Sequence, residues 1–137
     1  MTAAEDLPAV PGAYALHYRL DAPLAISVPR LGSPVLVPGT YVYAGSAFGP
    51  GGIRARVLRH LRADKRPHWH VDHLSAAAAC IGVEAVPGGS ECAIVAELLS
   101  DGAKIPVPGF GSSDCRTCRA HLVRLAAPGQ NRDIARQ

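Results

Sequence analysis

Aromatic side chains are scarce in this sequence: four tyrosines, two phenylalanines and one tryptophan make up 5% of its 137 residues. No run of about 18 apolar residues occurs, so the sequence predicts no membrane-spanning helix. The first residues, MTAAEDLPAVPG, lack the basic and then apolar order of a secretory signal. We therefore expect a cytoplasmic protein with no membrane partner, in which each aromatic side chain needs a physical explanation.

Cysteine is also in short supply, with four residues at positions 80, 92, 115 and 118. Because no export signal precedes them, we expect reduced thiols, which favours metal binding or plain burial over disulfide bonds. The segment CRTCRAH has the spacing C-x2-C-x2-H, which matches one half of a tetrahedral zinc site. The candidate ligands of a structural zinc are Cys92, Cys115, Cys118 and His121, and the segment HWHVDH at 68–73 could supply a ligand instead. The alternative is that Cys80 and Cys92 are buried small apolar residues and that the other two are free thiols.

Length and composition limit the number of domains and the kind of fold. A chain of 137 residues suits one domain over residues 1–137 and is long enough to bury a core without disulfide bonds. With 48% hydrophobic and 18% charged residues, a disordered chain is excluded. We expect residues 1–10 and 128–137 to be flexible ends.

Positive charge is concentrated in one short segment, although the net charge is only +3. Six of the fourteen basic residues lie between positions 54 and 66, and His68, Trp69 and His70 follow them. Such a patch is typical of proteins that bind a phosphate backbone, and Trp69 could stack on a base or anchor the loop. The alternative is a solvated, arginine-rich helix face. The candidate nucleic-acid-binding residues are Arg54, Arg59, Arg62, Lys65, Arg66, His68, Trp69 and His70.

Hydrophobic periodicity predicts mixed strands and helices. Strands are expected over 12–20, 25–28, 80–86 and 121–125, and residues 35–37 should pair with 40–46 across the Pro38–Gly39 turn. Helices are expected over 53–63, 70–79 and 91–99, the last with Ser90 as its N-cap. The apolar stripe of the first helix should contain Ile53, Val57, Leu58 and Leu61. The pattern indicates an α+β fold with a small, mainly antiparallel sheet flanked by helices.

Two short motifs begin or end with a tyrosine on a predicted strand: Gly12-Ala13-Tyr14 and Tyr43-Ala44-Gly45. A predicted helix with Arg56 and His60 follows, and a later helix begins with Glu91. This order resembles the GIY-YIG nuclease superfamily. The resemblance covers nearly the whole chain and is closest to a poorly characterised subfamily that is also found fused to endonuclease III-type glycosylases. The segments that carry it are PGTYVYAGSA, RHL, HWHVDHL, the Glu91-Cys92 pair, and PGFGSSDC followed by HL.

The resemblance implies a GIY-YIG-like fold and a catalytic site. The two tyrosines are 43 − 14 = 29 positions apart, which is longer than is usual in the superfamily and implies an inserted hairpin between the G-x-Y and Y-x-G strands. Glu91 would bind one Mg²⁺ or Mn²⁺, which suits an ion that keeps several water ligands. Tyr14, together with Tyr43, would orient or deprotonate the attacking water. Arg56 would offset charge on the phosphate, and His60 would hydrogen-bond a tyrosine or the phosphate.

Each of these residues also has a structural explanation when taken singly. Strand tyrosines usually pack with a satisfied hydroxyl, and this is the explanation we keep for Tyr18 and Tyr41. An acid at a helix start is favoured by the helix dipole. Many superfamily members carry a late asparagine near the site, but the only asparagine here is Asn131, so His121 is the candidate for that role.

The sequence thus predicts a hydrolase: a metal-dependent, structure-selective DNA endonuclease for repair or processing, with DNA preferred over RNA as the partner. No helix-turn-helix pattern indicates sequence-specific binding. The alternative is a non-catalytic, zinc-stabilised nucleic-acid-binding module that keeps the same fold.

Overall fold

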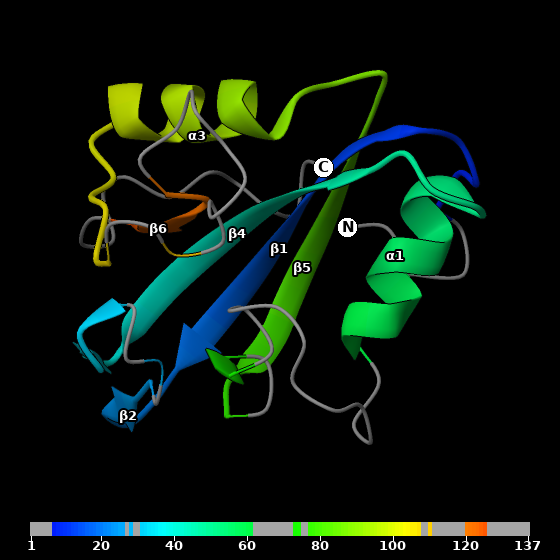
Figure 1. Cartoon of the computed structure of the whole chain (residues 1–137). Coiled ribbons are helices and arrows are strands. Elements are labelled where there is room, and N and C mark those ends of the chain that lie inside the picture. Colours follow the sequence, from blue (N-terminus) through cyan, green and yellow to red (C-terminus); the bar gives the residue numbers. More distant parts are fainter. Residues whose placement is uncertain are drawn as a thin grey trace.

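The computed structural model describes residues 7–26, 28, 31–61, 73–74, 77–107, 110 and 120–125. Its centre is a four-stranded sheet in the order β5-β1-β4-β6, and every pairing in it is antiparallel (Figure 1). The strands are β1 (Gly12–Leu20), β4 (Gly39–Ala47), β5 (Ala79–Pro87) and β6 (Leu122–Arg124). The predicted α+β fold with a mainly antiparallel sheet is confirmed.

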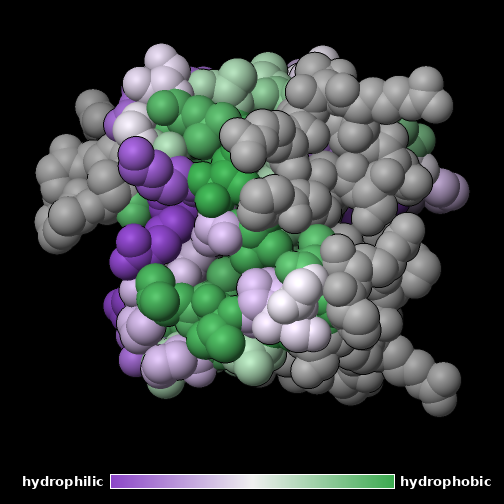
Figure 2. Space-filling view, turned by 60° about the vertical axis from the view of Figure 1, so that its left-hand side comes forward, coloured by the Kyte–Doolittle hydropathy of each residue, from purple (hydrophilic) through white to green (hydrophobic). Residues whose placement is uncertain are grey.

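Two helices cover opposite faces of this sheet: α1 (Gly52–Leu61) and α3 (Glu91–Ser100) (Figure 1). Successive side chains of a strand point to opposite faces. On β1, Tyr14 and Leu16 therefore belong to the hydrophobic cluster that contains Val57 of α1. Ala15 between them belongs to the second cluster, which contains Val95 of α3. The side that carries α3 is turned forward in Figure 2, where hydrophobic residues appear in groups beside strongly polar ones.

The predicted inserted hairpin is present between β1 and β4. It is a two-stranded sheet of β2 (Leu24–Ala25) and β3 (Val35–Leu36). The predicted partner of residues 35–37 is wrong, however, because Val35 and Leu36 pair with β2 and not with residues 40–46. The reason is that β4 has both edges occupied, by β1 along all nine of its residues and by β6 at Tyr41 to Tyr43. The hairpin is thus a separate unit beside the main sheet.

The start of α1 is tied to the N-terminal segment. The first turn of a helix has backbone N–H groups without partners inside the helix. Here the N–H of Ile53 donates to the carbonyl of Val10 at 2.9 Å, and the N–H of Arg54 donates to that of Pro8 at 3.1 Å. Leu7 is fully buried in the α1 cluster. Residues 7–10 are therefore held against α1, while the flexibility of residues 1–10 and 128–137 stays a prediction; residues 1–6 and 128–137 lie outside the described part.

The predicted helices agree with the structure in type but differ in detail. On α1, Ile53 and Val57 are buried, whereas Leu58 and Leu61 are exposed and His60 is buried in their place. Half of the predicted helix over 70–79 lies outside the described residues. Within the described half, residues 73 and 74 are helical, residues 77 and 78 form a turn, and Ala79 begins β5. On α3 the Ser90 hydroxyl accepts a hydrogen bond from the N–H of Ala93 at 3.4 Å, as an N-cap does. No helix among the described residues is long and apolar enough to cross a membrane.

Candidate active site

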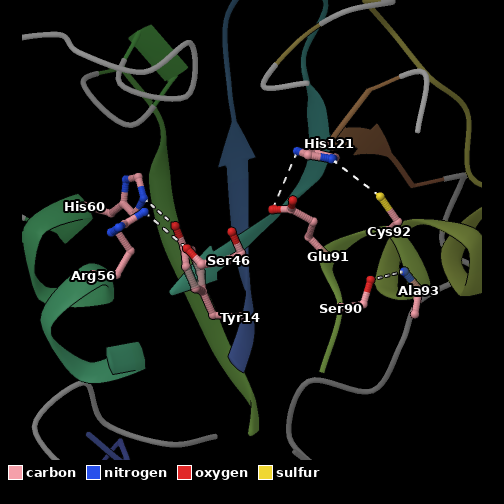
Figure 3. Close-up of polar contacts among 9 residues, drawn as sticks. All are labelled: Tyr14, Ser46, Arg56, His60, Ser90, Glu91, Cys92, Ala93 and His121. Atoms are coloured by element: carbon pink, nitrogen blue, oxygen red, sulfur yellow. Dashed lines mark hydrogen bonds and ion pairs between the residues drawn. The ribbon is translucent and has the colours of Figure 1, made fainter. Parts of the chain in front are cut away.

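Tyr14 and His60 form the centre of a polar cluster on the α1 face of the sheet (Figure 3). The Tyr14 hydroxyl oxygen lies 2.8 Å from Nε2 of His60, and the centroids of the two rings are 5.6 Å apart. Both side chains are almost completely buried, with 1% and 2% of their surface exposed. The prediction that His60 hydrogen-bonds a tyrosine is confirmed, and the bond joins the start of β1 to the last turn of α1.

Steric contacts explain why glycine occurs at positions 12 and 45 of the two motifs. Gly45 lies directly opposite Tyr14 in the sheet, and a side chain at this position would overlap the Tyr14 ring and hydroxyl. Gly12 adopts a positive φ of 156°, and a side chain there would meet the carbonyl oxygen of Val86 at 2.5 Å. A residue without a Cβ is therefore needed at both positions. The glycine of Y-x-G leaves the space that the tyrosine of G-x-Y fills.

Tyr43 contacts the same imidazole from β4. Its ring meets His60 edge to face, with centroids 5.9 Å apart and planes at 65°. Tyr43 is also buried, with 6% of its surface exposed. His60 therefore packs against both motif tyrosines. This contact explains why His60, and not Leu58 or Leu61 of the predicted stripe, lies on the buried side of α1.

Arg56 completes this group from one turn earlier on α1. Its Nη1 donates to the backbone carbonyl of Ser46, at the end of β4, at 3.1 Å (Figure 3). The guanidinium also acts on Tyr14 through its charge and a hydrogen bond. Four of the five predicted catalytic residues thus come together: Tyr14, Tyr43, Arg56 and His60.

The electrostatics of Tyr14 favour its neutral form. Burial is the largest cause that raises the pKa of the Tyr14 phenol above 10, and the neighbouring Tyr43 raises it further. The positive charge and hydrogen bond of Arg56 oppose this rise without cancelling it. The charge of Glu91 raises the pKa as the smallest of these effects. The phenol is therefore protonated at neutral pH and is not a general base by itself.

Glu91 reaches this end of the sheet from the opposite face. It is the first residue of α3, and its carboxylate points toward the strands in Figure 3, on the other side of them from His60. Its side chain is 25% exposed, and Oε2 lies 3.8 Å from Nδ1 of the buried His121. The Glu91 carboxylate is thus accessible to water and to ions from solvent. Its negative charge also acts on Tyr14.

A single exposed carboxylate fits Mg²⁺ or Mn²⁺ better than it fits zinc. Mg²⁺ binds through one or two carboxylates and keeps several waters, which Glu91 allows. Within the ranges that the structure describes, no three His, Cys, Asp or Glu side chains gather as a metal-binding group would. The Cys92 Sγ lies 3.9 Å from Nε2 of His121, while Glu91 faces the other ring nitrogen. One ion cannot contact all three, because the two nitrogens point in different directions.

The cysteines differ from the predicted reduced thiols. Cys92 is disulfide-bonded, whereas Cys80, the other cysteine that the structure describes, is free and exposed. Reduced thiols were expected from the lack of an export signal, which does not determine which sulfurs the fold brings together. The expected burial of Cys80 is also wrong, since it lies on the edge strand β5. Of the predicted zinc ligands, Cys92 and His121 are neighbours, and Cys115 and Cys118 lie outside the described residues.

The predicted basic patch is described only in part. Arg54 is exposed on α1, and its Nε donates to the carbonyl of Leu7 at 2.8 Å. Arg59 is half-buried on the same helix. The remaining candidates, Arg62, Lys65, Arg66, His68, Trp69 and His70, lie outside the described residues.

A buried polar pair was missed by the sequence analysis. Nε2 of His17 lies 2.7 Å from Oε1 of Glu84, and both side chains are buried. His17 is on β1 but points to the face opposite Tyr14, because its position differs from Tyr14 by an odd number. The sequence shows which face His17 takes, but it does not show that this face is covered or that Glu84 lies next to it.

A family model for a domain of unknown function, DUF123, matches residues 13–137. The match includes every residue of the polar cluster and both helices. No curated protein and no solved structure matches the chain.

Proposed function

The chain belongs to the DUF123 family, and we propose that it is a metal-dependent endonuclease of the GIY-YIG type that hydrolyses phosphodiester bonds in branched or flapped DNA during repair or processing. One observation carries this proposal. Tyr14 is hydrogen-bonded to His60 and to Arg56, while the charge of a solvent-accessible Glu91 acts on the same phenol. A packing role alone does not require an imidazole and a cation beside one buried hydroxyl.

Arg56 is the proposed phosphate-binding residue. A guanidinium matches the oxygens of a phosphate in a bidentate manner and keeps its charge at any physiological pH. The bond from Arg56 to the Ser46 carbonyl fixes the side chain over the end of β4 before substrate binds. Such a fixed positive charge offsets the charge that grows on the phosphate in the transition state.

Tyr14 and His60 are the proposed route for the proton of the attacking water. Because the raised pKa keeps the phenol protonated, the Tyr14 oxygen can accept a proton only as it gives its own away. Nε2 of His60, at 2.8 Å, is the acceptor when the imidazole carries its proton on Nδ1. In this step a water proton moves to Tyr14 and the phenol proton moves to His60. The hydroxide forms its bond to phosphorus while the bond from phosphorus to the 3′ oxygen breaks, and that oxygen leaves with the bonding electrons and takes a proton from solvent.

Glu91 is the proposed ligand of Mg²⁺ or Mn²⁺. The ion, when bound, supplies charge that stabilises the phosphate and the leaving 3′ oxygen. His121 lies behind the carboxylate and restricts its orientation, which is how it could take the part of the late asparagine. Its burial makes it a fixed support for the more exposed Glu91.

A second candidate function rests on burial. Tyr14, Tyr43 and His60 expose 6% of their surface or less, as packing residues do. This favours a non-catalytic nucleic-acid-binding module that keeps the fold and uses the basic side chains of α1. Structural zinc in such a module would require Cys92 as a thiolate, which a disulfide-bonded sulfur does not offer.

A cleavage assay separates the two functions. Branched, flapped and nicked DNA are incubated with the protein in Mg²⁺, in Mn²⁺ and in excess chelator. The endonuclease cuts at least one substrate with metal and none with chelator, and Glu91→Ala binds that substrate but does not cut it. Glu97→Ala, which removes an exposed carboxylate elsewhere on α3, cuts like the wild type. Binding to these substrates with no cutting in either metal contradicts the endonuclease and supports the module.

A further inference from the structure

Phe48 is the most exposed large hydrophobic side chain that the structure describes, with 67% of its surface accessible. It is also one of only two phenylalanines in the chain. The other, Phe110, is fully buried in the core. Phe48 follows Ala47, the last residue of β4, and opens the short loop that leads into α1 (Figure 1). A large aromatic ring held in solvent at a turn has no packing explanation.

The loop that carries Phe48 lies beside Arg56. Nη1 of Arg56 donates to the carbonyl of Ser46, two residues before Phe48. Nη2 lies 3.9 Å from the position that a Cβ on Gly49 would take, one residue after Phe48. The guanidinium thus lies close to the backbone on both sides of Phe48. The N–H of Gly52 closes the loop onto the Gly49 carbonyl at 3.1 Å. One short loop therefore carries an exposed aromatic residue and lies beside a cation.

Of the other exposed large hydrophobic residues that the structure describes, Val10, with 40% of its surface exposed, lies beside the start of α1, where its carbonyl accepts from the N–H of Ile53. The remaining ones do not extend this feature into a protein-binding patch. Val35 and Val37 lie at the hairpin and Leu99 lies on α3, both on the left of Figure 1 and turned forward in Figure 2, away from α1. Leu58 and Leu61 lie in the second half of α1, whereas the β4–α1 loop precedes its first residue. A lone ring beside a cation suits a ligand that joins a flat apolar face to a negative charge. A nucleotide has both.

We propose that Phe48 is a stacking platform for an unpaired nucleobase whose neighbouring phosphate binds Arg56. The part played by Arg56 rests on the proposed function, but the stacking does not require cleavage. Stacking of a base on an aromatic side chain contributes about 1–3 kcal/mol and accepts any base. In a continuous duplex both faces of every base are already covered by neighbours. Phe48 therefore gains a partner only at a flap, a gap or a strand end, which would make the enzyme selective for such structures.

Binding without metal tests this site apart from catalysis. Fluorescein-labelled flap DNA, the matched continuous duplex, and an RNA oligonucleotide with the sequence of the flap are titrated by anisotropy in chelator. Phe48→Ala should weaken binding of flap DNA about 5- to 150-fold, which is that stacking energy expressed as an affinity ratio. Binding of the continuous duplex should change less than about twofold, because its contacts are to the backbone. Phe48→Trp should restore flap binding, and a 2-aminopurine in the flap should be quenched by the wild type and by Phe48→Trp but not by Phe48→Ala.

The matched control is Val35→Ala, which removes an exposed apolar side chain of the distant hairpin and should leave all three affinities unchanged. A loss for RNA equal to that for the flap shows that an unpaired base of either nucleic acid is accepted, and a loss for DNA alone identifies DNA as the source. Equal affinities of the wild type and Phe48→Ala for the flap overturn the proposal, as does a loss of the same size for the continuous duplex. If Phe48→Ala weakens flap binding but the wild type never cuts, the stacking site stands and the endonuclease does not.

Discussion

The Tyr14 hydroxyl and Nε2 of His60 lie 2.8 Å apart, although 46 positions separate the two residues in the chain. The bond crosses from the central strand of the sheet to the helix that covers it. Because both groups are buried, loss of either partner leaves a polar atom without water to replace it. The pair therefore affects stability as well as the proposed chemistry, and the two effects can be measured separately.

Tyr14→Phe should change how stability depends on pH. The folded pKa of Tyr14 is raised above its unfolded value of about 10, so its contribution is fully present below pH 10 and is lost as pH rises through the folded pKa. The wild type should lose up to about 1.4 kcal/mol of unfolding free energy per pH unit from this group above pH 10. Tyr14→Phe should show a correspondingly shallower fall, measured by urea denaturation between pH 8 and about pH 11.

At pH 7 the same variant should be less stable than the wild type by about 1–3 kcal/mol, since His60 loses its buried partner. Tyr41 also has a raised pKa, but it is present in both proteins and contributes equally to each curve. Parallel curves above pH 10 would show that Tyr14 ionises as readily in the folded chain as in the unfolded one.

Gly45→Ala should disrupt the site through sterics alone. The new methyl group would overlap the Tyr14 ring, and that ring has little room to move because it is buried. We expect a loss of about 1–3 kcal/mol in unfolding free energy, typical of overpacking, and a loss of cleavage. Gly49→Ala is the control for stability, because its Cβ would meet its nearest neighbour at an ordinary 3.9 Å. Equal stability of the two variants would contradict the close contact between Gly45 and Tyr14.

Arg56→Ala and Arg54→Ala remove the same charge from one helix but should have different effects. Arg56 acts on Tyr14, so its loss should lower the rate of cleavage about 100-fold or more and should reduce this rate more than it weakens DNA binding. Arg54 is exposed and distant from the phenol, so its loss should weaken binding and reduce the salt dependence by about one phosphate contact. Single-turnover rates and affinities at several salt concentrations distinguish them. If Arg56→Ala loses affinity as much as rate, Arg56 only positions the DNA.

The buried pair of His17 and Glu84 should contribute to stability and not to cutting. Glu84→Ala removes one partner of a buried pair at 2.7 Å and should cost about 3–5 kcal/mol. Glu84→Gln keeps a hydrogen-bond acceptor and should lose less. Exposed Glu97→Ala should change stability by less than about 0.5 kcal/mol. A slower cleavage by folded Glu84→Gln would show that this pair also acts on the reaction.

The strands of the two motifs could be predicted from the sequence, because the residue patterns that indicate a strand are local. β-branched and aromatic residues at period two identify β4, and an N-cap serine identifies the start of α3. The four residues Tyr14, Tyr43, Arg56 and His60 could be predicted as a group only through the family resemblance. No spacing in one sequence states that a strand and a helix will meet.

The strand pairings and side-chain exposures that could not be predicted depend on which strand edges and helix faces the rest of the fold covers. Val35 and Leu36 were assigned to the wrong partner because the edges of β4 are taken by strands distant in sequence. Leu58 fits the predicted apolar stripe but is exposed, because the face of α1 that packs against the sheet carries His60 instead. The sequence supported no prediction for Phe48, since whether a neighbouring element covers its ring is seen only in the fold.

The central claim is that one cation binds at the Glu91 carboxylate, whose charge acts on the Tyr14 phenol. A crystal structure with Mn²⁺, located by anomalous scattering, tests this directly. We predict one ion coordinated by the Glu91 carboxylate and by waters, and no ion there in crystals of Glu91→Gln. An ion bound between Cys92 and His121, or crystals at millimolar Mn²⁺ without an ion at Glu91, would contradict the account.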